Sequence, residues 1–479
     1  MDRKEWLKSA VFYEIYPTSF FDANGDGVGD VEGIIRKLDY IAGLGCNGIW
    51  LNPLFCSPFR DGGYDVADYK RVDPRFGTNE DLVRLFKEAK ERGIRVLLDL
   101  VPGHTSDTHP WFRRSAEAAR NEYSDYYIWS PNVWTDAVGE GLRTVNGMCP
   151  RDGNYAVNFF SMQPALNYGY AAPTEPWQIY WRDARLLPLR REIEGVMKFW
   201  LGLGCAGFRV DMAASLVKND ADKSATCALW REMFSVVRGE YPEAVFVSEW
   251  SDPPRAVGEA GFDMDFFLHF GACEPAYMSL FRRGAESVFS RGSKGAFAPF
   301  FDTFAQMRAQ LGGNGFIALP GGNHDMVPRL ADGKDEAVVK AAYAFLSTLP
   351  AVPFFYYGDE IGMRYQELDS KDGGYSRTGS RTPMRWNGGK NAGFSDAEET
   401  YLPVGEGESA ESMEAREGSL LHTVRALARL RRTQPALAAS AELRVLQKEG
   451  VAVYERSGGG QRLLVAVNPN GAAVSLPFA

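Results

Sequence analysis

The sequence contains no run near the ~20 consecutive apolar residues of a membrane span, so we expect no membrane-spanning helix. It also lacks an excess of positive charge: 53 Lys and Arg stand against 62 Asp and Glu, and the net charge of −9 argues against a nucleic-acid partner. The first residues include Asp2 and Glu5 and lack the apolar centre of a signal peptide. We therefore predict a cytoplasmic protein that binds neither membrane nor nucleic acid.

The cysteines are few and do not have the spacing of a metal site. The six are Cys46, Cys56, Cys149, Cys205, Cys227 and Cys273, and none forms a CxxC motif with another. Cys46 and Cys205 lie in apolar segments that lead into predicted strands, where buried reduced thiols are expected. We predict free thiols instead of a disulfide framework.

What the sequence does contain is a regular alternation of apolar runs and helical patterns. Buried parallel strands read as short unbroken apolar runs. Eight such runs are present, at residues 11–20, 47–51, 94–101, 206–210, 244–248, 262–267, 315–319 and 353–357. Helical patterns lie between them, for example at 31–44 and 79–92. Strand alternating with helix predicts an α/β fold with a parallel sheet, and eight units predict a closed (β/α)₈ TIM barrel.

The alternation breaks in two places. Residues 104–170 are loop-rich and aromatic, and they are too long for one connection between a strand and a helix. We predict an inserted domain here, after the third strand. Residues 436–479 contain apolar segments separated by turns such as SGGG and NPNG, which predicts a C-terminal antiparallel β domain. The barrel would then consist of residues 1–103 and 171–435.

Four carboxylates stand at the ends of predicted barrel strands. They are Asp99, Asp211, Glu249 and Asp325, and a loop follows each of them. The carboxyl ends of the strands in such a barrel meet at one face, where active sites are built, so these acids should converge. One such acid alone could be a helix N-cap. Four of them indicate a converging acidic site.

Ordered motifs make the chain resemble the α-amylase family, glycoside hydrolase family 13. The main motifs are DLVPGH (99–104), GFRVD (207–211), SEW (248–250) and NHD (323–325). Supporting motifs are YEIYPTSF near the start, GYDVADY (63–69), QPALN (163–167), GDE (358–360) and RTPMRW (381–386). They follow the family's order over nearly the whole chain.

The resemblance implies roles for three of the acids. Retaining cleavage needs a carboxylate nucleophile and a carboxylic acid about 5–5.5 Å apart. By the match, Asp211 attacks the anomeric carbon, Glu249 is the acid and then the base, and Asp325 binds sugar hydroxyls. Arg209 lies two residues before Asp211, so both side chains should project to the same side of a strand. There the guanidinium would keep the carboxylate ionised.

Further matches imply sugar-binding residues. His104 and His324 would donate hydrogen bonds to the sugar in the first subsite, although each could be a structural histidine. Asp99 would contact the sugar or support the residues that do. Asp65 and Arg381 match a pair that closes the pocket in exo-acting α-glucosidases, and a buried structural ion pair is the alternative. Tyr64 would stack on the terminal sugar in that pocket.

Residues 22–30 read DANGDGVGD, with oxygen donors at alternate positions and glycines for a sharp turn. This pattern suits a hard cation such as Ca²⁺. It resembles the opening of an EF-hand loop, but Gly33 stands where that motif needs a Glu. Related α-glucosidases have a calcium loop here, which implies structural Ca²⁺ on Asp22, Asn24, Asp26, the Val28 carbonyl and Asp30. The alternative is an Asx-turn loop without metal.

Four positions depart from the family pattern, and one of them is Ala165, which replaces the Asp of the common QPDLN motif in the inserted domain. Gly103 and Ser215 replace the Asn and His that hold calcium in amylases, so that second calcium site is not expected. Met212 follows the nucleophile and matches neither the residue typical of α-1,6-preferring relatives nor those typical of α-1,4-preferring ones. The motifs therefore leave the linkage open.

The favoured function is a retaining α-glucoside hydrolase that acts on short α-glucans or disaccharides through a covalent glycosyl-enzyme. A transglycosylase such as trehalose synthase or a 4-α-glucanotransferase is the alternative, because it would use the same catalytic residues with a sugar hydroxyl in place of water. A non-catalytic relative acting as a binding subunit is a third, although such relatives typically lack the catalytic acids. The motifs do not indicate an oligomeric state.

Overall fold

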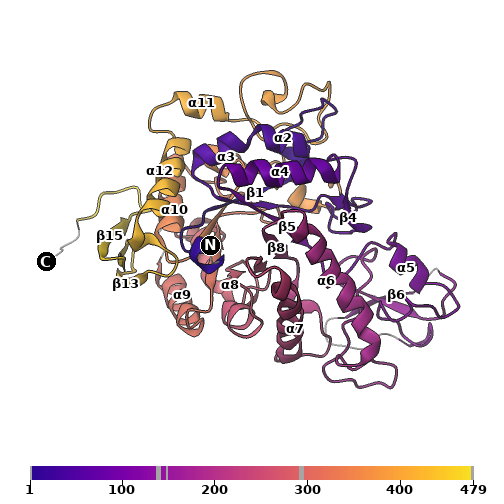
Figure 1. Cartoon of the computed structure of the whole chain (residues 1–479). Helices are drawn as coiled ribbons and strands as arrows, with labels where there is room; N and C mark the ends of the chain where they lie inside the picture. Colours follow the sequence, from indigo (N-terminus) through magenta and orange to yellow (C-terminus); the bar gives the residue numbers. More distant parts are fainter. Residues whose placement is uncertain (1–2, 136–141, 147–148, 291–295, 476–479) are drawn as a thin grey trace.

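The computed structural model describes residues 3–135, 142–146, 149–290 and 296–475. Its centre is a closed barrel of eight strands in the order β1-β12-β11-β10-β9-β8-β5-β2 (Figure 1). These strands are β1 (Phe12–Ile15), β2 (Gly48–Leu51), β5 (Arg95–Leu100), β8 (Gly207–Val210), β9 (Val245–Ser248), β10 (Met264–Phe266), β11 (Phe316–Pro320) and β12 (Val352–Tyr356). Each overlaps one of the eight predicted runs, and all neighbours pair in parallel, so the predicted barrel is confirmed.

The register of the strands brings their polar ends to one level. Asp99 of β5 pairs with Arg209 of β8, and Val210 pairs with Ser248 of β9. The ladder continues one residue further, because Asp211 N–H donates to the Leu100 carbonyl at 2.8 Å and Glu249 N–H to the Val210 carbonyl at 2.9 Å. The chain therefore leaves the barrel directly after these acids.

Helices form the outer ring of the barrel (Figure 1). They include α2 (Val31–Arg36), α3 (Leu38–Leu44), α4 (Asn79–Glu91), α6 (Leu187–Gly202), α7 (Ser224–Glu240), α8 (Glu274–Phe281), α9 (Ala298–Gln310), α10 (Glu336–Thr348) and α12 (Leu420–Thr433). The helix predicted at 31–44 is divided at Lys37, whose φ of −103° and ψ of 5° lie outside the helical region. Its ammonium group lies over the rings of Phe21 and Trp386.

Short elements flank the barrel. They are α1 (Arg3–Leu7), β3 (Phe55–Cys56), β4 (Asp68–Val72) and α11 (Ala410–Ala415). Between β5 and β8 the chain forms α5 (Pro110–Ser115) and the antiparallel pair β6 (Arg143–Asn146) and β7 (Asn154–Val157). These lie within the segment predicted as an inserted domain. The boundaries at 104 and 170 remain a prediction.

The end of the chain forms the predicted antiparallel sheet. Its strands are β13 (Glu442–Gln447), β14 (Ala452–Gly458) and β15 (Gln461–Val467), in that order. Tyr454 of β14 is buried and shares a 2.6 Å hydrogen bond with Thr348 at the end of α10, which fixes the sheet against the barrel. All six cysteines are free thiols, as predicted. In the part of the chain that is described, no helix has both the length and the apolar character needed to cross a membrane.

Candidate active site

A cavity of about 430 Å³ lies at the carboxyl ends of the barrel strands. It is lined by Asp61, Tyr64, His104, Phe159, Asp211, Met212, Ala214, Ser215, Glu249, Trp250, Phe270, Asp325 and Arg377. Its size falls within the range of small-molecule sites. The structure thus brings together the three acids that the sequence singled out as catalytic.

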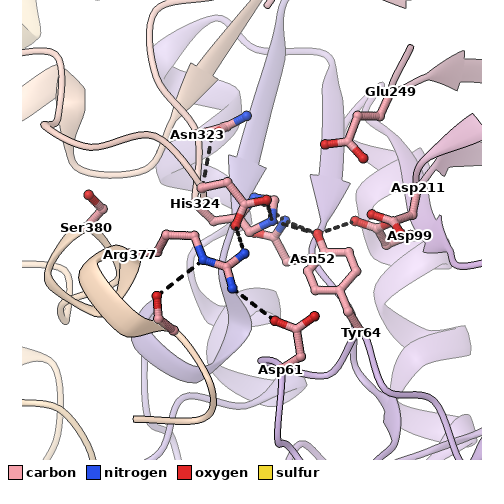
Figure 2. A network of polar contacts seen from close by, with 12 residues as sticks. Asn52, Asp61, Tyr64, Asp99, Asp211, Glu249, Asn323, His324, Arg377 and Ser380 are labelled. Atoms are coloured by element: carbon pink, nitrogen blue, oxygen red, sulfur yellow. Dashed lines mark hydrogen bonds and ion pairs between the residues drawn. The ribbon is translucent and has the colours of Figure 1, made fainter. Parts of the chain in front are cut away.

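One guanidinium holds the acidic centre. Arg209, which is 1% exposed, donates hydrogen bonds to Asp211 at 2.8 Å and to Asp99 at 2.9 Å, and it forms an ion pair with Glu249 at 2.8 Å. The expectation from strand alternation, that Arg209 and Asp211 project to the same side, is therefore met. Because a guanidinium is planar and always charged, it fixes the directions of all three carboxylates. Figure 2 shows Asp99, Asp211 and Glu249 gathered on one side of the site.

Burial raises the pKa of both proposed catalytic acids. Burial raises the pKa of Glu249 to about 7, against the opposing charge of Arg209. Burial also raises the pKa of Asp211, where Arg209 again opposes it. The Met212 N–H donates to Glu249 Oε2 at 3.0 Å and helps to fix this side chain. A carboxyl group that titrates near neutral pH suits a general acid that later acts as a base.

His324 joins several acidic groups on the opposite side. Its Nδ1 lies 2.7 Å from Glu14 Oε1, and its Nε2 lies 2.7 Å from Tyr64 Oη and 3.3 Å from Asp325 Oδ2. Burial alone would lower the pKa of His324, but Asp325 and Glu14 outweigh it and raise that pKa to about 9. Burial would raise the pKa of Asp325, yet His324 and Arg377 hold it well below its usual value. Asp325 is therefore ionised and can accept hydrogen bonds.

A second acid–arginine pair closes one end of the cavity. Arg377 donates to Asp61 at 3.1 Å and to Asp325 at 2.9 Å (Figure 2). Gln163 Nε2 donates to the other Asp61 oxygen at 2.7 Å. Arg377 lies on the short 3₁₀ helix Tyr375–Ser380. The pair therefore joins the loop between β3 and β4 to a 3₁₀ helix far along the chain.

The prediction that Asp65 and Arg381 form a pair at the cavity is wrong, because each binds other partners. The carboxylate of Asp65 is fully buried and accepts hydrogen bonds from Ser57 Oγ at 2.9 Å and from the N–H groups of Arg60 and Asp61. It thereby stabilises the turn at 57–61. Arg381 donates to the His324 carbonyl at 3.0 Å and to Asp325 at 2.8 Å. The pair that faces the cavity lies four residues earlier in both segments.

His104 lines the cavity, but both of its ring nitrogens have protein partners. Nε2 lies 3.2 Å from the Tyr64 carbonyl, and Nδ1 lies 3.2 Å from Asn158 Nδ2. Gly103 makes room for this amide, because a Cβ there would lie 2.6 Å from Asn158 Nδ2. Burial lowers the pKa of His104 to about 4, so the ring is neutral. Its role as a donor to sugar stays a prediction.

Of the other two predicted sugar contacts, Tyr64 lines the cavity and Asp99 lies beside it. Tyr64 lines the cavity, with its ring stacked on His324 at a centroid distance of 5.4 Å. Asp99 is buried beside the cavity, where it accepts hydrogen bonds from Tyr64 Oη at 2.9 Å and Trp50 Nε1 at 3.1 Å. Asp99 thus supports Tyr64, which lines the cavity.

The loop at 22–30 turns its side chains toward its own backbone. Asp22 accepts hydrogen bonds from the N–H groups of Asn24, Gly25 and Gly27 and from Ser395 Oγ. Asp26 accepts from Val28 N–H, and Asp30 from Gly33 N–H, where it caps α2. Among the described residues, no three His, Cys, Asp or Glu side chains gather to hold a metal. This arrangement fits an Asx-turn loop, and Ca²⁺ binding stays a prediction.

Eight of the residues that line the cavity are not among the predicted site residues, and four of these stand out: Asp61, Arg377, Phe159 and Phe270. Asp61 and Arg377 lie just outside the motifs GYDVADY and RTPMRW. The motifs therefore indicate the right two segments, but the residues predicted from them, Asp65 and Arg381, are not the pair that faces the cavity. Phe159 and Phe270 are 46% and 37% exposed at the cavity mouth. Nothing in their sequence context distinguishes them from core aromatic residues.

Comparisons with known proteins agree with the geometry. The model of the α-amylase catalytic domain matches residues 14–440. Trehalose synthase/amylase TreS of Mycobacterium tuberculosis is 34% identical over 91% of this chain and 76% of its own length. The oligo-1,6-glucosidase of Heyndrickxia coagulans is 31% identical over 97% and 92%. The structure of trehalulose synthase MutB from Pseudomonas mesoacidophila is similar with a TM-score of 0.79 and 28% identity, over 97% of this chain and 90% of that one.

Proposed function

Because this chain belongs to the α-amylase family of glycoside hydrolases, we propose that it is a retaining α-glucosidase that removes terminal glucose from short α-glucans or disaccharides. The observation that carries the proposal is the placement of Asp211 and Glu249 on one buried guanidinium at the cavity floor. Two acids that must act on the same glycosidic bond need such a shared, fixed position.

The reaction would proceed in two displacements. Asp211 attacks the anomeric carbon while Glu249 gives its proton to the glycosidic oxygen, so the C1–O bond to the leaving group breaks as the glycosyl-enzyme ester forms. Glu249 then takes a proton from water, whose oxygen attacks C1 and releases Asp211. Arg209 keeps Asp211 oriented as it loses and regains its charge. The raised pKa of Glu249 suits both of its steps.

The Asp61–Arg377 pair supports action at a chain end. Its members reach across the cavity from two distant loops, and Arg377 also contacts Asp325. A fixed guanidinium between two carboxylates forms a rigid polar wall that matches the hydroxyls of one terminal sugar. A longer chain would have to displace this wall to pass through the site.

Transfer to a sugar hydroxyl is the second candidate. The cavity lining includes the apolar side chains of Met212, Trp250 and Phe270, which give an acceptor sugar a surface to pack on. The named relatives include both a glucosidase and two sugar synthases, so the comparisons favour neither. A non-catalytic binding role has less support, because both proposed catalytic acids line the cavity.

Product analysis distinguishes these functions. The purified protein is incubated with maltose, isomaltose, sucrose, trehalose and maltohexaose, and the products are separated by chromatography. Glucose release from the disaccharides supports hydrolysis, whereas new disaccharides or longer chains support transfer. Asp211→Asn and Glu249→Gln serve as controls and should lose turnover while keeping the wild-type circular dichroism spectrum. No product from any α-glucoside would contradict the proposal.

Three expectations from the sequence accompany this proposal. We expect the protein to act in the cytoplasm and to bind α-glucosidic sugars without a nucleic-acid or membrane partner. We also propose that residues 104–170 act as a unit that covers the site, which the contact of Asn158 Nδ2 with Met212 Sδ at 3.6 Å supports. We also propose that residues 22–30 bind a structural Ca²⁺ ion.

A further inference from the structure

A buried carboxylate holds the chain on both sides of the proposed general acid. Asp265 of β10 is 0% exposed and lies opposite Ser248 in the parallel register. Its Oδ1 accepts hydrogen bonds from Ser248 Oγ at 2.7 Å, Trp250 N–H at 3.1 Å and Ser251 N–H at 3.3 Å. Its Oδ2 accepts the Asp252 N–H at 2.8 Å. One side chain thus binds residues 248 and 250–252, which flank Glu249.

The bound segment has an unusual backbone. Ser251 has a φ of 61°, in the left-handed region that residues other than glycine rarely adopt. Its Oγ accepts the Leu268 N–H at 3.1 Å, and its carbonyl accepts the Ala272 N–H at 3.0 Å. Such a conformation persists only where the surroundings over-determine it, and it concentrates at functional sites. The turn after Glu249 therefore depends on the contacts that Asp265 provides.

The same turn controls where Glu249 and Trp250 point. The Glu249 backbone is also fixed from β8, because its N–H donates to the Val210 carbonyl at 2.9 Å and its carbonyl accepts the Ala213 N–H at 3.2 Å. Trp250, whose N–H is held by Asp265, lines the cavity beside Glu249. A shift of residues 250–252 would turn both side chains relative to the substrate.

We propose that Asp265 is a positioning residue for the general acid: its carboxylate holds residues 250–252 so that Glu249 is directed at the glycosidic oxygen. The inference rests on the proposed function and adds a residue that does not line the described cavity. All four of its neighbours donate to it, so both of its oxygens act as acceptors in this clamp.

The substitution Asp265→Asn tests this with little change in size. An asparagine has one acceptor oxygen, and its NH₂ group would face backbone N–H donors. Burial raises the pKa of Asp265 to about 8, and the four donors oppose that rise. The substitution would weaken the clamp and would leave Asp211 and Arg209 intact.

The chain offers a matched control two residues earlier, directly before the same strand. Asp263 is also buried, and it binds Arg3 and Arg238 at 2.7 Å each and accepts the Phe246 N–H at 2.9 Å. It lies directly before β10, whereas the site lies at the carboxyl ends of the strands. Asp263→Asn should therefore reproduce a general loss of stability without changing the position of Glu249.

The experiment measures kcat/KM for wild type and both variants on aryl α-glucosides whose leaving groups differ in acidity, and on maltose. Wild type should cleave all of them. General acid catalysis contributes about 10²–10⁴-fold. Asp265→Asn should therefore lose about 100-fold on maltose but less than tenfold on the best leaving group, which needs no proton. Asp263→Asn should lose the same factor on every substrate.

Three results bear on the inference in different ways. Equal losses for Asp265→Asn across all leaving groups would overturn the positioning role and leave the proposed function standing. A wild-type protein inactive on every α-glucoside would overturn both. If Asp265→Asn does not fold, Ser248→Ala removes one donor only, and it should show the same leaving-group dependence on a smaller scale. A uniform loss in Ser248→Ala would also overturn the inference.

Discussion

Replacing Arg377 by alanine should weaken the binding of the terminal sugar in the transition state. Arg377 is the partner of Asp61, whose side chain is 5% exposed. The substitution leaves Asp61 buried with Gln163 as its remaining side-chain donor. Burial raises the pKa of Asp61 to about 6 and Arg377 opposes this rise, so losing the arginine should raise that pKa further and protonate part of the carboxylate at neutral pH.

The magnitude follows from the burial of the pair. Truncating one partner of a buried charge pair costs about 2–5 kcal/mol in binding. Because the Arg377 side chain is 18% exposed and water can partly screen the pair, the lower part of this range applies, about 2–3 kcal/mol. Each 1.4 kcal/mol is tenfold, so kcat/KM should fall roughly 30- to 150-fold. Arg377→Lys keeps the charge without the planar fork and should lose less.

The assay compares kcat/KM on maltose and on longer maltooligosaccharides with free or blocked non-reducing ends. The loss should be greatest on maltose, which depends most on the first subsite. Arg385→Ala is the control, because Arg385 binds backbone carbonyls such as that of Gly407 at 3.0 Å in the same region. A change of less than threefold in Arg377→Ala, or equal cleavage of blocked and free ends by wild type, would refute the closed pocket.

Three further predictions concern pH and metal. Activity should fall as pH rises through about 7, because Glu249 must be protonated, and it should fall again on the acid side, where Asp211 becomes protonated; a pH–rate profile shows both limbs. The pKa of His324 is raised in the folded state, so its stabilising contribution, roughly 3 kcal/mol at most, should be complete below pH 6.5 and lost as pH rises through about 9 in urea unfolding. If residues 22–30 bind Ca²⁺, a chelator should lower the melting temperature, calcium should restore it, and Asp26→Ala should abolish the effect; indifference to both would leave an Asx-turn loop.

The barrel and its acidic centre could be predicted because local sequence encodes them directly. Every strand of a barrel covered by helices is buried on both faces, so each appears as an unbroken apolar run. The acids stand at the ends of those runs, and the two-residue repeat of a strand places Arg209 beside Asp211. Backbone geometry therefore determines this part of the site.

The wall of the pocket could not be predicted in the same way. Asp61 and Asp65 lie four residues apart in one segment, and Arg377 and Arg381 lie four residues apart in another. Neither segment has a long regular repeat that decides which side chain faces the cavity. Tertiary contacts decide it: Asp65 turns inward to bind the turn at 57–61. The contacts of Asp265 could not be predicted either, because its partners lie at the end of the neighbouring strand β9 and in the turn directly after it.

The central claim is that Asp211 and Glu249 cleave an α-glucosidic bond by two displacements at the same carbon. Proton NMR of the first product from an α-glucoside, recorded before mutarotation, tests this most directly. Two displacements invert the anomeric carbon twice, so the account predicts that α-glucose appears first. β-Glucose as the first product would contradict the covalent mechanism and the roles given to both acids.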